Sequence, residues 1–465
     1  MSHTDELEVN DLQSRLNATR VARIETPTSE ERVSELVRAA GRTGQSVCIA
    51  GGRHSMGGQQ FAEGALLLDM RELKRVIALD RATGLIEVEA GIQWPDLISY
   101  LYSDQSSDDA PWAIRQKQTG VDDVTIGGSL GANGHGRGLT LPPLVDDVES
   151  FVLIDAHGDA LRCSRTENAE LFSLAIGGYG LFGVMTRVTL RLEPRKKVRR
   201  VVSIIPVREL MERVGERLER GYLYGDCQYS VDLSVEAGSH PGVFSCYAEV
   251  DIDTPLPSST LQLTSEDWAR LYQLVRTDKA RAFQAYSMYY LRSSGQVYWS
   301  DTHQLSSVFE GYTGAVDVQK GTEMISELYV PREDLVPFMA AARADLVQRE
   351  VDVTYGTIRL IEPDEDTFLP WATEPWACIV INLHVTHTEE GRRRAAENFQ
   401  RLIDRAIEFG GSYFLTYHRW ATRAQVETCY PQFPEILRKK RTRDPDERFQ
   451  STWYRHYRDM FADQL

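Results

Sequence analysis

The pattern of hydrophobic and polar positions predicts short strands and helices in alternation over the first 195 residues. Period-two alternation and short apolar runs indicate strands, whereas apolar residues three and four apart indicate amphipathic helices. Thr28 or Ser29 caps the first predicted helix and Gly41 ends it. Residues 1–20 are typical of a leading helix or a loose tail. The strands are predicted at residues 47–50, 65–70, 84–90, 145–161 (with a hairpin turn) and 184–192, and the helices at 28–41, 95–101 and 167–176.

The pattern changes after Pro194, where the charged run RKKVRR marks a boundary. Longer alternating segments follow, among them ISELYVP, VTYGTIRLI and CIVINLHVTH, with helices predicted between them. Antiparallel strands beside helices are typical of an α+β domain. The segment YFLTYHRW predicts a last strand that begins near residue 412. We therefore predict three parts: residues 1–197, residues 198–411, and a C-terminal segment, residues 412–465, that returns to the first part.

A glycine-rich loop follows the strand at residues 47–50, in the stretch SVCIAGGRHSMGG. Glycines let successive backbone N–H groups turn to one side, and such a concave row binds phosphate oxygens. Arg53 adds a positive charge beside the row, and His54 follows it. The loop therefore predicts a site for a pyrophosphate, with His54 near the reactive ring of the same cofactor.

A second glycine-rich block, RQKQTGVDDVTIGGSLGANGHGRG, spans residues 115–138, with seven glycines between Gly120 and Gly138. Such a density indicates tight turns or close backbone approach to a ligand. A third block, GGYGLFG, matches the glycine spacing of nicotinamide-binding folds. That fingerprint leaves a strand and opens a helix, whereas here a helix enters and a strand leaves. The order therefore disfavours a nicotinamide site.

Composition narrows the class of protein. The 465 residues exceed a single compact core, and the formal net charge of -16 disfavours nucleic acid and anionic membrane surfaces as partners. No apolar run is long enough to span a bilayer, and the acidic N-terminus lacks the apolar core of a signal peptide. Six scattered cysteines without Cys-x-x-Cys pairs fit a reduced compartment. We expect a cytoplasmic protein.

The blocks GGRHSMGG, TIGGSLGANGHG and GGYGLFGVMTRVTLRL, in this order over residues 46–192, resemble the FAD domain of the vanillyl-alcohol oxidase superfamily. GGRHS is similar to alditol and aldonolactone oxidases, and DPDERFQS near the C-terminus to decaprenylphosphoryl-ribose oxidases. The resemblance implies a PCMH-type FAD-binding domain of two α+β subdomains, with a substrate (cap) domain of antiparallel sheet flanked by helices. It implies FAD contacts from Gly51, Gly52, Arg53, His54, Ser55, Met56, Gly57, Gly58, Thr119, Gly120, Thr125, Gly127, Gly128, Ser129, Asn133, Gly134, His135 and Val184.

The resemblance also implies a covalent bond from His54 to the flavin 8α-methyl group, as in the histidyl-flavin members. The alternative is a histidine that only hydrogen-bonds a phosphate or a loop carbonyl. No cysteine lies near Val121, so a second covalent link of the berberine-bridge type is not expected.

Candidate catalytic residues lie in the second and third parts. Alditol oxidases carry a Glu-x-Arg pair over the flavin, and the matching segment here is Thr357-Ile358-Arg359. Arg359 either stabilises the anionic reduced flavin or forms an ordinary salt bridge. His384 occupies a position similar to a histidine of that family. Because residues three apart on a strand point to opposite faces, His384 and His387 make a poor metal pair, and we expect no metal.

Tyr417 and His418 stand where the family usually has a lysine. A phenol or imidazole can take the substrate hydroxyl proton as hydride leaves for flavin N5. In a strand only one of the two faces the flavin, and the register favours Tyr417.

The sequence thus predicts an FAD-dependent oxidase that acts on the CH–OH carbon of a polyol, sugar or similar alcohol. Reduced flavin would pass its electrons to O2, giving H2O2, or to another acceptor. The first alternative is a tailoring oxidase that acts on a larger scaffold by cyclisation, desaturation or alcohol oxidation. The second is a flavin-holding module without turnover.

Overall fold

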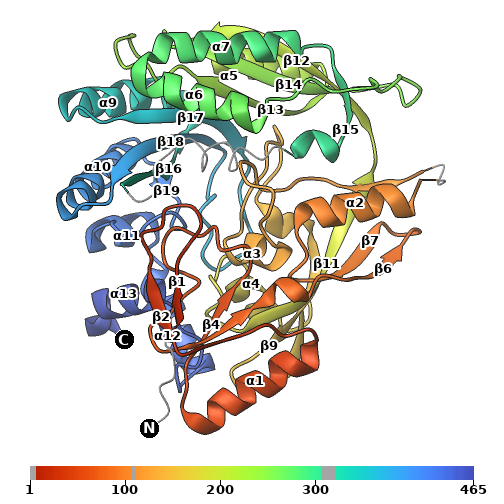
Figure 1. Ribbon diagram of the computed structural model, residues 1–465, viewed down its shortest axis with the longest axis vertical. Helices are drawn as coiled ribbons and strands as arrows, with labels where there is room; N and C mark the ends of the chain where they lie inside the picture. The colour runs from red at the N-terminus through yellow and green to blue at the C-terminus, as the bar shows by residue number, and fades with distance from the viewer. Residues whose placement is uncertain (1–6, 107–109, 306–319) are drawn as a thin grey trace.

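The computed structural model describes residues 7–106, 110–305 and 320–465 of the chain. Figure 1 shows the N-terminal part of the chain in the lower half of the molecule and a large sheet in the upper half. The C-terminal helices return beside the lower half. Strands and helices are mixed throughout, and antiparallel pairing dominates the two larger sheets. The predicted α+β fold class is confirmed.

A small parallel sheet begins the lower half, in the order β3 (Arg23–Glu25), β5 (Leu66–Asp69), β4 (Val47–Ala50). Helix α1 (Glu30–Thr43) buries Val33, Leu36, Val37 and Ala40 in the same core cluster as Val47 and Leu66. Ser29, one of the two predicted caps, accepts a hydrogen bond from the backbone N–H of Arg32. The helix runs past Gly41 and ends at Gly44, whose φ of 68° is the left-handed conformation that glycine allows.

The helix or tail predicted for residues 1–20 is wrong for the residues that the structure describes; residues 1–6 lie outside them. Strands β1 (Leu7–Val9) and β2 (Thr19–Val21) pair with each other and bury Val9 and Val21. Between them Asp11 accepts hydrogen bonds from the hydroxyl of Ser14 and the backbone of Arg15. Such a carboxylate turn competes with helix formation, which explains the difference.

A six-stranded sheet completes the lower half in the order β10-β9-β11-β7-β6, with β8 paired to β11. The block GGYGLFG lies between α4 (Ala169–Ala175) and β11 (Val184–Pro194), the helix-to-strand order that the sequence indicated. The remaining elements are β6 (Val76–Asp80), β7 (Leu85–Glu89), α2 (Trp94–Asp104), β8 (Trp112–Ile114), α3 (Ile126–Gly131), β9 (Val148–Ile154) and β10 (Ala160–Ser164).

The upper half is built on one eight-stranded sheet of order β15-β12-β14-β13-β17-β18-β16-β19. Helices α5, α9 and α10 pack on one face, where Phe338 of α9 lies near Ile379 and Ile381 of β18. The other face meets the lower half and the α6–α7 pair. The strands are β12 (Lys197–Pro206), β13 (Tyr222–Tyr229), β14 (Pro241–Val250), β15 (Val297–Trp299), β16 (Gly321–Pro331), β17 (Val353–Ile361) and β18 (Trp376–Thr386), and the helices α5 (Leu210–Glu219), α6 (Ser265–Thr277), α7 (Lys279–Arg292), α9 (Leu335–Gln348) and α10 (Glu389–Glu408).

The last predicted strand is much shorter in the structure than in the pattern. Strand β19 contains only Ser412 and Tyr413, and the backbone then leaves the sheet. Side chains from elsewhere take over its hydrogen bonds: Gln59 donates to the carbonyl of Thr416, and the indole N–H of Trp453 to that of Leu415. Alternation beyond residue 413 therefore does not decide which side chains share a face.

The C-terminal segment is bonded to the lower half. Phe449 forms a parallel bridge with Val47, and the Arg448 guanidinium donates to the carbonyls of Ala40 and Gln45 at the end of α1. Its helices are α11 (Arg423–Cys429), α12 (Phe433–Arg443) and α13 (Thr452–Met460). Single 3-10 turns occur at Met70–Glu72, Leu144–Asp147, Val207–Glu209, Thr302–Gln304, Arg332–Asp334 and Ala462–Gln464.

Among the described residues, no helix combines the length and apolarity needed to cross a membrane.

Candidate functional site

A cleft of about 900 Å³ lies in the lower half, between the loop after β4 and the start of α3. The carboxyl end of β4 delivers the loop, and Thr125 starts α3 by accepting a hydrogen bond from the backbone N–H of Gly128. The polar and glycine wall of the cleft consists of Gly51, Gly52, Arg53, His54, Ser55, Gln59, Gln60, Thr125, Gly127 and Gly128.

Two glycines let the walls of the cleft approach each other closely. A Cβ atom on Gly51 would overlap the hydroxyl of Thr125, and one on Gly52 would overlap the backbone carbonyl of Asp123. Arg53, next in the loop, has a left-handed φ of 60°, and its guanidinium bonds Asp69 at 2.9 Å. The loop is thus held with its backbone and one positive charge against the cleft, which suits a phosphate-bearing ligand.

His54 lines the same cleft as a neutral imidazole. Burial lowers the pKa of His54 to about 4. At neutral pH the ring therefore keeps a lone pair on one nitrogen, which is the form that can act as a nucleophile or accept a hydrogen bond.

A second cluster of polar groups surrounds Glu327, where β16 faces the lower half. The Nε2 atom of His135 lies 2.6 Å from Oε1 of this carboxylate, and the hydroxyl of Tyr329 lies 2.8 Å from the same oxygen. The thiol of Cys378 lies 3.2 Å from it, and the hydroxyl of Tyr417 donates to the other oxygen at 2.9 Å. Four groups, three of them from distant parts of the chain, therefore converge on one buried carboxylate.

The His135–Glu327 pair holds a proton. Nδ1 of His135 lies 3.0 Å from the carbonyl oxygen of Gly136, which can only accept, and Nε2 faces the carboxylate. Both ring nitrogens must then carry hydrogen, unless Glu327 is itself protonated. Burial raises the pKa of Glu327, but His135 and Arg359 outweigh burial and hold it at about 2. The proton therefore resides on the imidazole side of a buried ion pair.

Three ligand-type atoms of this cluster, from His135, Glu327 and Cys378, lie within 4.8 Å of one another. The Glu327 carboxylate already accepts four hydrogen bonds from neighbouring donors. Three of these donors share Oε1 and one bonds Oε2, so the geometry is that of a hydrogen-bonded cluster.

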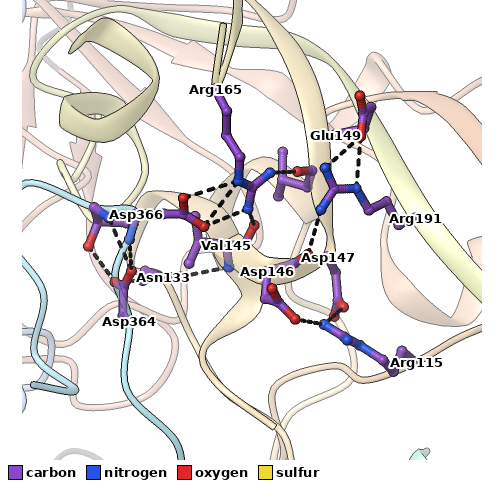
Figure 2. Close-up of polar contacts among 12 residues, drawn as sticks. Arg115, Asn133, Val145, Asp146, Asp147, Glu149, Arg165, Arg191, Asp364 and Asp366 are labelled. Atoms are coloured by element: carbon purple, nitrogen blue, oxygen red, sulfur yellow. Dashed lines mark hydrogen bonds and ion pairs between the residues drawn. The ribbon is translucent and has the colours of Figure 1, made fainter. Parts of the chain in front are cut away.

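The loop that carries His135 is held by a network that Figure 2 displays. Asn133 has a left-handed φ of 47°; its amide donates to Asp364 at 2.9 Å, and its side-chain oxygen accepts from the backbone of Val145 at 3.0 Å. Beside it Arg165 bonds Asp366 at 2.6 Å and donates to the carbonyl of Val145 at 3.1 Å. These contacts tie the second glycine block to the segment after β17 and thereby fix where His135 meets the large sheet.

Comparison with known proteins adds an assignment to this geometry. Residues 21–164, which include the cleft loop, α3 and His135, match the family model described as an FAD binding domain. This part of the chain is therefore an FAD-binding domain.

Three relatives are similar to this chain in sequence. The chain is 32% identical over 166 residues to an uncharacterized oxidoreductase, ORF5 of the fasciation locus, from Rhodococcoides fascians, a match that covers 36% of each chain. It is 29% identical over 194 residues to L-gulonolactone oxidase of Bos taurus, 42% of each chain. It is 23% identical over 447 residues to decaprenylphosphoryl-beta-D-ribose oxidase of Mycolicibacterium smegmatis, 92% of each chain. The chain thus spans only about two fifths of the length of the first two of these relatives.

The cleft fits the FAD that the family implies. Gly51 and Gly52 let the loop backbone lie against Thr125 and Asp123 more closely than a side chain would allow, and the donors of the cleft suit a pyrophosphate. Several residues expected at the cofactor do not line this cleft. His135 and Asn133 lie in the Glu327 cluster and its supporting network, Ser129 bonds the indole N–H of Trp94, and Val184 is buried in the core under α1. Met56, Gly57, Gly58, Thr119, Gly120 and Gly134 also lie outside the cleft lining.

Of the two candidate bases, only Tyr417 lies in the Glu327 cluster. Burial and then the neighbouring Glu327 charge raise the pKa of Tyr417 well above its usual value, so it is a proton donor to Glu327 at rest. His418 lies instead among aromatic rings, 4.5 Å from Phe399 and 5.5 Å from Trp420 between ring centroids. Burial lowers the pKa of His418 to about 3.

His418 should make folding sensitive to acid. Between about pH 6.5 and pH 3 the unfolded chain binds a proton at this residue that the native protein does not, so stability falls as pH decreases. From pH 7.5 to pH 5 the loss from this one group is about 2 kcal/mol. The variant His418→Phe lacks this group, so between pH 7.5 and pH 5 its unfolding free energy should fall by about 2 kcal/mol less than that of the unmodified protein. Urea unfolding at the two pH values measures the difference. If the difference in unfolding free energy between the two proteins is the same at both pH values, His418 is not buried in its neutral form.

Strand pairing shows where the other candidates lie on the sheet. Arg359 pairs with Cys378, which in turn pairs with Tyr329, so all three share the face of the Glu327 cluster. Thr357 pairs with Val380, which pairs with Glu327. A carboxylate is therefore present at the same level of the sheet as Thr357: it belongs to Glu327 on β16, two strands away.

His384 lies on the same face but outside this cluster. It is four residues beyond Val380 on β18, about 13 Å along the strand. Its Nδ1 atom bonds Glu323 at 2.8 Å, while Nε2 of His387 bonds the hydroxyl of Thr322 at 3.0 Å. The two histidines thus have separate partners.

Sequence reasoning missed Glu327, Tyr329 and Cys378. One signal was present: a carboxylate in the otherwise apolar strand ISELYVP is costly unless it is paired. Nothing in the local pattern indicates which strands bring its partners.

Proposed function

We propose that this protein is an FAD-dependent oxidoreductase that removes a hydride from a CH–OH carbon. The observation that supports it most is the phenol of Tyr417, bonded to the buried carboxylate of Glu327 where the large sheet meets the FAD-binding domain. When bound, the flavin supplies the acceptor for the hydride. The chain must bind and orient that cofactor and move the hydroxyl proton.

Proton transfer can run through two atoms of the chain. As the substrate C–H bond breaks, its hydroxyl proton passes to Oη of Tyr417, and the proton of Tyr417 passes to Oε2 of Glu327. The alcohol thus loses one proton and one hydride and becomes a carbonyl compound. The proton on His135 keeps the carboxylate ready as an anion before the transfer and is not itself consumed. Tyr417 is the catalytic residue in this scheme, and Glu327 and His135 are positioning residues.

Arg359 supplies the positive charge that such a site needs. It shares the face of the Glu327 cluster, and its charge lowers the pKa values of both Glu327 and Tyr417. A guanidinium in a water-poor site stabilises negative charge that develops on the substrate oxygen or on the reduced cofactor. We propose this role for Arg359 rather than an ordinary surface salt bridge.

The experiment is anaerobic mixing of the purified yellow protein with a panel of alcohols that includes polyols, sugars and aryl-alkyl alcohols. Loss of the oxidised flavin absorbance supports the proposal, and admission of O2 with assay of H2O2 identifies the acceptor. A protein that stays yellow with every alcohol is a binding module and overturns the proposal.

A larger substrate is the second candidate. Thr357 stands where the resemblance to alditol oxidases implies a carboxylate. An aromatic pocket of about 620 Å³ lies beside the same sheet face. Both features favour a tailoring oxidation of a larger scaffold over oxidation of a small polyol. A cytoplasmic location stays a prediction from the sequence.

We also propose that His54 bonds covalently to the flavin. Its neutral, buried imidazole lines the cofactor cleft, which suits attachment from about pH 5 upward. Denaturation of the protein in acid should leave the yellow colour with the polypeptide, and the variant His54→Ala should release all of it. Ser55→Ala, a neighbour in the same loop, is the matched control and should retain the bound flavin. Complete release from the unmodified protein would overturn the covalent bond.

A further inference from the structure

A second pocket, of about 620 Å³, lies under the α6–α7 pair, separate from the cofactor cleft. Figure 1 shows this pair above β13 and β17. The pocket opens where these two strands diverge, because they are paired only at Cys227–Ile358 and Gln228–Thr357. Most of its wall is apolar or aromatic, from Trp268, Tyr272, Val275, Phe283, Tyr286 and Tyr355.

The wall of this pocket includes one polar atom that lacks a partner among the described residues. The side-chain oxygen of Gln228 is buried without a hydrogen bond, and the residue is only 7% exposed. Asp226 on β13 and Arg359 on β17 each have a buried atom of the same kind, but they lie outside the lining of this pocket. Buried polar groups are normally satisfied, so unpartnered ones beside a cavity point to a ligand that supplies their partners.

Two residues of the pocket, Gln228 and Tyr355, lie on the sheet face that also carries Glu327. Tyr355, Thr357 and Arg359 alternate along β17 and share one face, and Gln228 pairs with Thr357 in the same row. Gln228 and Glu327 are thus separated by three strand spacings, about 14 Å. The charge of Arg359 acts on the pKa of Tyr355, which burial raises. The polar cluster and the aromatic pocket therefore lie on one face of the large sheet.

We propose that this pocket is a second compartment of the substrate site and takes the apolar, ring-containing end of an elongated alcohol. This inference rests on the proposed function, because the other end of the same molecule must present its CH–OH carbon near Tyr417. The aromatic wall favours a flat apolar group over a second polyhydroxyl segment, since its rings offer area and few hydrogen bonds. The unpartnered oxygen of Gln228 suits a hydroxyl or amide N–H in the middle of that molecule.

The test compares two probes with the same reactive end, 8-phenyl-1-octanol and 1-octanol, by calorimetric titration of the flavin-loaded protein. Burial of a phenyl ring should make the aryl probe bind about 10- to 100-fold more tightly. The variant Phe283→Ala should lose most of this advantage, and Ala282→Trp, which fills the pocket, should abolish it. Met288→Ala is the matched control, because this residue of α7 is 46% exposed.

Outcomes for the pocket and for the reaction are read separately. Equal affinities of the two probes, or an advantage that survives in both variants, overturns the compartment. A binding advantage that the variants remove, in a protein whose flavin no alcohol reduces, supports the compartment and overturns the alcohol oxidation. The flavin content and the thermal unfolding midpoint of each variant show whether it has folded. If one of the two variants does not fold, the other still tests the compartment.

Discussion

Replacing Tyr417 with phenylalanine is expected to slow flavin reduction by an alcohol about 10²- to 10⁴-fold, the usual contribution of a positioned acid–base group. The variant loses only the hydroxyl that bonds Glu327 at 2.9 Å, and the ring can remain against Phe414. The measurement is anaerobic stopped-flow reduction with the alcohol that bleaches the unmodified protein best. We expect the flavin content and the visible spectrum to stay unchanged.

His418→Phe is the matched control, one residue away and without contact to the Glu327 cluster. It should reduce its flavin at the rate of the unmodified protein, because His418 packs among Phe399, Tyr413 and Trp420. If Tyr417→Phe is as fast as the unmodified protein, the proton leaves by another group and the assignment fails. If His418→Phe is the slow variant instead, the two roles are reversed.

Replacing Glu327 with glutamine is expected to cost about 3–5 kcal/mol of unfolding free energy, the typical result when one partner of a buried ion pair is removed. The amide cannot accept from all four donors, and the proton on His135 is left without a counter-charge. Urea unfolding at pH 7.5 measures the effect. Flavin reduction should also slow, because Tyr417 loses the group that receives its proton.

A double-mutant cycle separates the ion pair from general damage to the core. His135→Asn in the Glu327→Gln background should restore part of the lost stability, because the charge that needed Glu327 has gone. Strictly additive losses from the two substitutions would show that the pair carries no coupling energy. The hydrogen-bonding cluster would then be a packing feature only.

The local sequence predicts those parts of the fold that depend only on residues near one another along the chain. Ser29 begins α1 because a hydroxyl can satisfy a free N–H of the first turn, and alternation from residue 184 predicts β11 because period two matches a pleated strand. The glycine loop after β4 is of the same kind, since its backbone freedom is a property of its own residues. The failure near residues 414–420 occurs where side chains from elsewhere satisfy the backbone. The failure near residues 1–20 has a local cause, the turn that the Asp11 carboxylate holds.

The sequence by itself determined the α+β class, the glycine-walled cleft with His54 in it, and the choice of flavin over nicotinamide. Only the tertiary structure decided that Glu327 is the centre of the second cluster, and that Tyr417 rather than His418 faces it. The reason is that strand pairing is a long-range choice: β16 and β17 contact β18 through hydrogen bonds whose partners lie tens of residues away. No periodicity encodes such partners, so the row that joins Thr357, Val380 and Glu327 exists only once the sheet has formed.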